Sequence, residues 1–145
     1  MYKIPIVSIK MVKDKDHKYY KRTVSSSKEA FELIKDLIQD SDKEIYLVLC
    51  LDNKNHINCI YPVSIGTSDC VFSEPRDILK AVIESNSNKI ITAHNHPSGD
   101  VNPSINDTEN IETLKEASEI FNVKLLDHII IGDEKYYSFA DENLL

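Results

Sequence analysis

The segment from Ile45 to Leu51 is apolar at every one of its seven positions. A strand of this kind belongs in a sheet with both faces covered, because a half-exposed strand alternates apolar and polar residues. The segment is also far too short to cross a membrane as a helix, which needs about 20 apolar residues. The sequence therefore predicts a central strand in a sheet that is covered by helices.

The rest of the chain alternates between strand-like and helix-like patterns. We expect strands over residues 4–12, 18–24, 44–51, 56–65, 89–94, 124–131 and 136–140, and helices over 26–40, from 73 onward and over 104–121. Short turns typical of hairpins join several of these strands. The predicted fold is α/β, with a mixed, mostly antiparallel sheet.

Each predicted helix begins at a serine that can cap it. Ser26 precedes Glu29 by three positions, which is the spacing of a capping box. Ser73 is the expected N-cap of the second helix, because Pro75 follows in the first turn, where a missing N–H costs nothing. Ser104 and Asp107 repeat the capping-box spacing at the third helix, so a cap alone would explain Asp107.

Two histidines end the strand that is predicted over residues 89–94. Side chains at i and i+2 share one face of a strand, so the imidazoles of His94 and His96 can reach a single ion. Asp107 lies one turn into the next helix and can face back over the loop. Two histidines and one carboxylate form a catalytic zinc set, which predicts a Zn²⁺ cofactor at His94, His96 and Asp107. Ser104 can cap the helix and still present its hydroxyl to this site.

A hydrolase with such a site also needs a base that accepts a proton from the attacking water. Glu44 is a candidate because it opens the central strand, where the end of a sheet can face a cleft, but an ordinary charged loop residue explains this position equally well. His128 lies in apolar sequence, where we expect an imidazole bonded to a backbone group rather than a ligand. His17 and His56 fall in predicted turns and are expected to be solvated.

Composition and charge limit the classes of protein that remain. The 145 residues are expected to form one domain, with a hairpin and a helix over 1–43 and a metal-binding core over 44–145. The first residues lack the apolar run of a signal peptide, so we expect a cytoplasmic protein without a membrane partner. The net charge of −7 argues against a strongly electrostatic nucleic-acid binder, and the Lys-rich stretch over 10–22 fits a solvated hairpin. The three cysteines, Cys50, Cys59 and Cys70, show no C-x-x-C spacing, which favours reduced thiols.

The string from His94 to Gly99, followed by Pro103, Ser104 and Asp107, resembles the metal motif H-x-H-x₇-S-x-x-D of the RadC-like branch of the JAB/MPN superfamily. The resemblance extends from about Ile45 to Leu145 and includes Gly66-Thr67, Pro75-Arg76-Asp77, Leu126 to Gly132 and Ser138-Phe139. It implies a three-layer α-β-α, cytidine-deaminase-like MPN (JAMM) core, zinc ligands at His94, His96 and Asp107, and an oxyanion-stabilising serine at Ser104. It also implies that the catalytic glutamate, which comes from the start of the first core strand, is Glu44.

The resulting functional prediction is a zinc-dependent hydrolase that cleaves peptide or isopeptide bonds in a peptide or protein substrate. Two alternatives stay open: a nucleic-acid-associated protein, such as a nuclease or a DNA-repair protein, and a non-catalytic MPN interaction module. The residues before the core do not resemble the helical domain that RadC-like proteins usually carry, so the DNA-repair role has little support. The intact ligand set speaks against the non-catalytic module. The sequence leaves the physiological substrate and the oligomeric state open.

Overall fold

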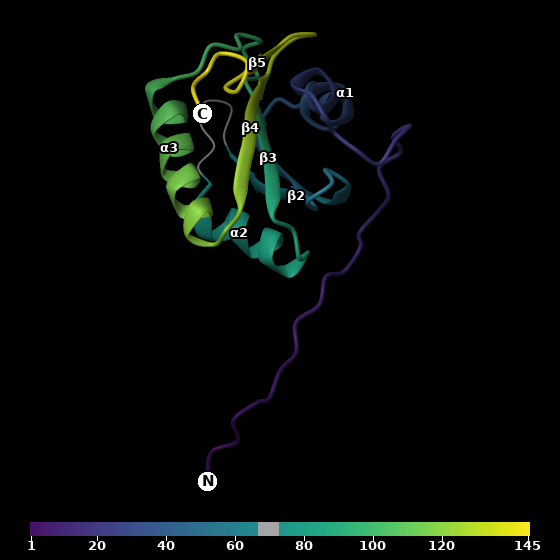
Figure 1. Ribbon diagram of the computed structural model, residues 1–145, viewed down its shortest axis with the longest axis vertical. Coiled ribbons are helices and arrows are strands. Elements are labelled where there is room, and N and C mark those ends of the chain that lie inside the picture. Colours follow the sequence, from purple (N-terminus) through teal and green to yellow (C-terminus); the bar gives the residue numbers. More distant parts are fainter. Residues whose placement is uncertain (67–72) are drawn as a thin grey trace.

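The computed structural model describes residues 1–66 and 73–145, so Thr67 and Cys70 lie outside the described residues. Its helices are α1 (Ser27–Ile38), α2 (Pro75–Glu84) and α3 (Ile105–Ile120), and its strands are β1 (Ile45–Leu51), β2 (Ile57–Ile65), β3 (Lys89–Asn95), β4 (Lys124–Ile131) and β5 (Tyr136–Ser138). The strands form a central sheet, with α1 on one face and α2 and α3 on the other (Figure 1). The predicted α/β fold with helices covering the sheet is confirmed.

The sheet has the strand order β2-β1-β3-β4-β5, and only the β3–β4 pair is parallel. This order confirms the mixed, mostly antiparallel sheet. Within β1, Val48 and Cys50 pack toward α2 and α3, whereas Leu47 and Leu49 pack toward α1. The uninterrupted apolar sequence of β1 therefore supplies both hydrophobic cores, as the prediction of a strand covered on both faces requires.

The N-caps predicted from the sequence are confirmed for α1 and α3 but not for α2. The Ser26 hydroxyl accepts the Glu29 N–H at 3.1 Å, and α3 begins with a complete capping box. The N-cap predicted for α2 is wrong: Glu74 occupies that position, and the hydroxyl of Ser73 instead lies 2.6 Å from that of Ser64. Pro75 starts α2 without a side-chain cap, because its ring already holds the helical backbone angle. None of the helices in the described ranges combines the length and hydrophobicity that a membrane crossing requires.

The N-terminal hairpin that we expected over residues 4–12 and 18–24 does not form. Residues 1–12, here called the N-terminal arm, extend away from the body without helix or strand (Figure 1), and the side chains of Tyr2 and Ile6 are fully exposed. The only pairing across 1–24 is a bridge from Thr23 to His56. An isolated hairpin is at best marginally stable. In addition, His17 donates to the Leu33 carbonyl at 2.8 Å, which holds this turn against α1, while the residue stays exposed as expected.

Candidate metal centre

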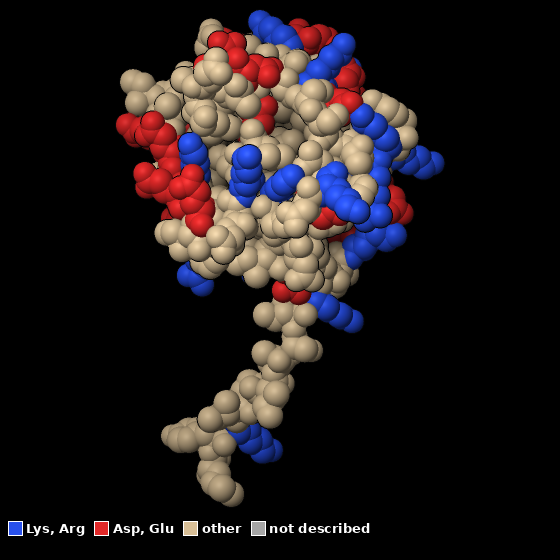
Figure 2. Space-filling model, viewed as in Figure 1, with Lys and Arg blue, Asp and Glu red and all other residues tan. Residues whose placement is uncertain are grey.

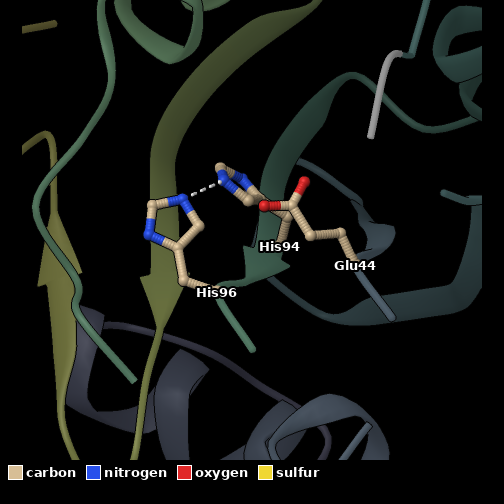
Figure 3. A group of neighbouring side chains, drawn as sticks. All are labelled: Glu44, His94 and His96. Carbon is tan, nitrogen blue, oxygen red and sulfur yellow. Dashed lines mark hydrogen bonds between the residues drawn. The ribbon is translucent and has the colours of Figure 1, made fainter. Parts of the chain in front are cut away.

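His94 and His96 lie at the end of β3 and project from the same face of the sheet (Figure 3). Their Nε2 atoms are 3.1 Å apart. Asn95 points to the opposite face, where its Oδ1 accepts the Ile45 N–H at 2.7 Å and its Nδ2 donates to the Lys43 carbonyl at 3.0 Å. The i, i+2 spacing thus brings the two imidazoles together, and the residue between them holds the start of β1.

Asp107 joins the two histidines from the first turn of α3. Its Oδ1 lies 3.4 Å from His94 Nε2, and its Oδ2 lies 3.3 Å from His96 Nε2. The same carboxylate accepts the Ser104 N–H at 2.8 Å, while the Ser104 hydroxyl accepts the Asp107 N–H at 3.0 Å. The capping box therefore fixes the carboxylate in the orientation that faces the imidazoles.

The ionisation of Asp107 follows from this contact. Burial alone would raise the pKa of its carboxyl, but the hydrogen bonds with His94 and His96 outweigh burial and hold that pKa well below its usual range. The hydrogen bond with Asp107 in turn raises the pKa of His96. A negative charge is thus stabilised beside two nitrogen donors, which is the combination that a divalent cation needs.

Glu44 approaches the same site from the start of β1. The antiparallel register places Tyr46 opposite His94, so Glu44 falls opposite the residue just past the end of β3, His96. Glu44 is 8% exposed, and ligand atoms of Glu44, His94 and His96 all lie within 4.8 Å of one another. Figure 3 shows its carboxylate turned toward the two imidazoles. These three residues could hold a metal ion.

A second group of side chains supports His94 from within the sheet. His128, on the neighbouring strand β4, lies with its Nε2 2.8 Å from His94 Nδ1 and its Nδ1 2.7 Å from Thr92 Oγ1. The ring of Tyr46 stacks on both imidazoles. Burial lowers the pKa of His128 well below its ordinary value, which keeps the ring neutral. Sequence reasoning placed His128 in the interior but assigned it a backbone partner, whereas its partners are side chains.

The Nδ1 atoms of His94 and His96 each have a hydrogen-bond partner away from the site, which leaves the two Nε2 atoms facing the site. His96 Nδ1 lies 2.7 Å from the Asp100 carbonyl, which can only accept, so Nδ1 carries a proton and Nε2 is the nitrogen that faces the site. At His94, Nδ1 is likewise occupied by His128 Nε2 at 2.8 Å, which leaves His94 Nε2 toward the site. The Asp100 carbonyl lies in a loop without regular structure, and no pattern in the sequence indicated its role.

The distances among these groups test whether the residues fit a zinc ion. Nitrogen ligands at roughly 2.0–2.1 Å from a tetrahedral Zn²⁺ lie roughly 3.4 Å from one another. The separations among His94 Nε2, His96 Nε2 and the Asp107 oxygens are 3.1, 3.4 and 3.3 Å. The side chains of His96 and Asp107 are 15% and 17% exposed, against 3% for His94, so solvent reaches the group from their side. These separations are compatible with His94, His96 and Asp107 surrounding a single metal ion.

Comparison with known proteins agrees with these observations. The family model of the RadC-like JAB domain matches residues 24–144. A UPF0758 protein of Chlorobium phaeovibrioides is 40% identical over 124 residues, which cover 86% of this chain and 56% of that protein. UPF0758 proteins of Aquifex aeolicus and Methanosarcina mazei are 40% and 38% identical, over 85% and 86% of this chain and 53% and 55% of their own lengths. The chain thus spans about half the length of the curated relatives that it matches. By its sequence, the chain belongs to the RadC-like JAB domain family.

Proposed function

We propose that this domain is a zinc-dependent hydrolase that cleaves an amide bond, in a peptide or an isopeptide. The observation that carries the proposal is the close approach of His94, His96 and Asp107, with Glu44 beside them. The two Nε2 atoms are 3.1 Å apart, and the two Asp107 carboxylate oxygens lie 3.4 Å from His94 Nε2 and 3.3 Å from His96 Nε2. Such a site combines three ligands, one open position and a nearby carboxylate, which is the composition of catalytic rather than structural zinc sites.

His94, His96 and Asp107 would hold the ion. When bound, Zn²⁺ supplies Lewis-acid polarisation of the substrate carbonyl and lowers the pKa of water to about 7. The protein groups then supply orientation. The bonds from His128 to His94 and from the Asp100 carbonyl to His96 fix both imidazole planes, so little reorganisation accompanies binding.

Glu44 would act as the general base. Its backbone is anchored by the Gly66 N–H, which donates to the Glu44 carbonyl at 2.8 Å, and by the contacts of Asn95 with the residues on either side. The carboxylate would accept a proton from the attacking water and deliver it to the nitrogen of the leaving amine. Because the carboxylate of Glu44 is buried beside the two imidazoles, it requires no large movement to reach either atom.

Ser104 would stabilise the negative charge that develops on the carbonyl oxygen. Its hydroxyl oxygen accepts the Asp107 N–H through a lone pair, and the hydroxyl hydrogen can be donated to the substrate. The serine is exposed at the N-terminus of α3, where the helix dipole also favours negative charge. Cap and oxyanion donor are therefore compatible roles for this residue.

The charge of the surface near the site favours a protein substrate over a polyanion. The helix that carries Asp107 exposes Glu109, Glu112, Glu116 and Glu119, and acidic side chains gather along α3 in Figure 2. A nucleic acid would meet repulsion along this helix, and the whole chain has a net charge of −7. These charges support the peptidase proposal rather than the nuclease alternative.

The proposal is tested with a Glu44→Gln variant, with Glu112→Gln on the exposed face of α3 as the matched control. Zinc content measured by mass spectrometry should equal the wild-type value in both variants. Turnover of a substrate identified from peptide and isopeptide libraries should fall at least ~100-fold in Glu44→Gln alone. Full turnover by Glu44→Gln would refute the assignment of the base, and a zinc-loaded wild type that cleaves no library member would refute the hydrolase.

The ligands are tested separately from the base. His94→Ala should lose tightly held zinc. Asp107→Asn should also lose zinc but should retain α3, because asparagine keeps a side-chain oxygen for the helix cap. Zinc binding by His94→Ala at the wild-type affinity would show that the metal lies elsewhere.

A further inference from the structure

Two cysteines face each other on neighbouring strands of the sheet. Cys50 in β1 is the register partner of Cys59 in β2, and both are free thiols. Side chains directly opposite in an antiparallel pair have Cβ atoms about 4.5–5.5 Å apart, close to the separation of about 3.5–4.5 Å in a disulfide. The two thiols are close enough for each to shift the pKa of the other. Only a small approach of the two strands is needed to join them.

The environments of the two sulfurs differ in a way that gives each a separate role. Cys50 is fully buried, whereas Cys59 is partly exposed on the outermost strand of the sheet. The Ser85 hydroxyl, at the end of α2, contacts both thiols and lies 2.8 Å from the Ser87 hydroxyl. Cys50 belongs to the buried apolar core, whereas Cys59 packs against that core and stays partly exposed.

The same contacts shift the pKa values of the two thiols in opposite directions. The contact with Cys50 lowers the pKa of Cys59 below its ordinary value, and the same contact together with burial raises the pKa of Cys50. The thiolate forms on the sulfur that solvent can reach. The pair has the arrangement of an attacking cysteine with a resolving cysteine beside it.

We propose that Cys50 and Cys59 are an oxidisable dithiol that hydroperoxides convert into a reversible cross-strand disulfide. In the first step the Cys59 thiolate attacks one peroxide oxygen and the O–O bond breaks. The departing oxygen takes a proton and leaves as water or an alcohol, and Cys59 becomes a sulfenic acid. In the second step the Cys50 sulfur attacks the Cys59 sulfur, the S–O bond breaks, and the hydroxyl leaves with the Cys50 proton as water. The two sulfurs together lose two electrons, and the peroxide gains them.

This site is distinct from the metal centre. Cys50 lies four residues along β1 from Tyr46, which is about 13 Å at the usual rise of a strand. No ligand of the proposed zinc site contributes to the thiol pair, so the oxidation of the thiols can be measured without reference to hydrolase activity.

The test uses the full chain, exposed to a small excess of hydrogen peroxide. The number of thiols titrated after unfolding should fall from three to one, the intact mass should fall by about 2 Da, and peptide mapping should show a Cys50–Cys59 link. A thiol reductant should restore all three. Cys70→Ser serves as the control and should form the same link.

Single variants separate the two roles. Cys50→Ser should accumulate the sulfenic acid on Cys59, which dimedone captures, and Cys59→Ser should react at least 10-fold more slowly than the wild type. Cys50→Ala offers a second replacement if serine disturbs the core. A link through Cys70, equal rates for Cys59→Ser and wild type, or peroxide oxidation of methionine before the thiols would each overturn the proposal.

Discussion

Gly132 controls the position of the loop that carries His96. It follows β4 and packs directly against the loop after β3: a Cβ added there would lie 2.3 Å from the Gly99 carbonyl oxygen and 2.6 Å from Val101 Cγ1. Ordinary contacts of a Cβ begin near 3.4 Å. In a Gly132→Ala variant the loop and the end of β4 would therefore have to separate by about 1.1 Å.

This displacement acts on the metal site through two bonds. The His96 N–H donates to the Ile131 carbonyl at 2.9 Å, and His96 Nδ1 donates to the Asp100 carbonyl at 2.7 Å. Ile131 belongs to the end of β4 and Asp100 to the loop after β3, so His96 is bonded to both of the segments that must separate. Zinc–ligand distances tolerate only about 0.2 Å, so we expect Gly132→Ala to weaken zinc affinity by ~10-fold to ~100-fold. The overpacking itself should cost about 1–3 kcal/mol of unfolding free energy.

Zinc affinity is measured by competition with a chromophoric chelator, and stability by urea denaturation of the metal-free protein. Ile34→Val in α1 is the control, since it should lose about 0.5–1.5 kcal/mol in the opposite core layer without a change in zinc affinity. Wild-type zinc affinity in Gly132→Ala would refute the reasoning that the loop position sets the geometry of His96.

Three further predictions concern the surroundings of the site and the N-terminal segment. His128→Leu should weaken zinc affinity by ~10-fold to ~100-fold in the chelator competition, because His94 loses the partner of its Nδ1; unchanged affinity would contradict that role. The bonds from Lys21 and Ser25 lower the pKa of Glu29 to about 2, so Glu29 stabilises the fold above the carboxyl pKa of the unfolded chain, and this contribution is lost as the pH falls toward 2. In urea denaturation, the free energy of unfolding should accordingly be lower for Glu29→Gln than for Glu112→Gln at pH 7, and equal for the two variants near pH 2. A difference that persists near pH 2 would contradict the assignment. Trypsin should cut the N-terminal arm at Lys3 and Lys10 before it cuts the body, as followed by mass spectrometry; protection of the arm would show that it is covered in solution.

The sequence was sufficient for those features that depend on local spacing. The apolar run in β1 predicted a sheet covered on both sides, and the i, i+2 spacing predicted the shared face of His94 and His96. Ser104 and Asp107 predicted a capping box, which the structure contains. In each case the relevant distance is set by the geometry of a single strand or helix turn.

The features that depend on how strands pair were not accessible in this way. Glu44 could not be placed beside the histidines from spacing alone, because its position depends on the register between β1 and β3. The contact between His128 and His94 depends on the parallel pairing of β3 with β4. The expected N-terminal hairpin failed for a related reason: alternation of residues indicates a strand only if a partner is available, and here residues near His17 pack on α1 instead.

The side chain of Asn95 has a consequence for motion at the site. Because Asn95 holds the backbone on both sides of Glu44, while its two neighbours in sequence supply the imidazoles, small fluctuations at this end of the sheet should move Glu44, the proposed base, together with His94 and His96. The backbone distance between Glu44 and the two histidines depends on the pairing between β1 and β3. Amide hydrogen exchange at Ile45 should therefore report the same opening event that would release a metal held as proposed, so that the lifetime of this metal would be a property of a strand pair.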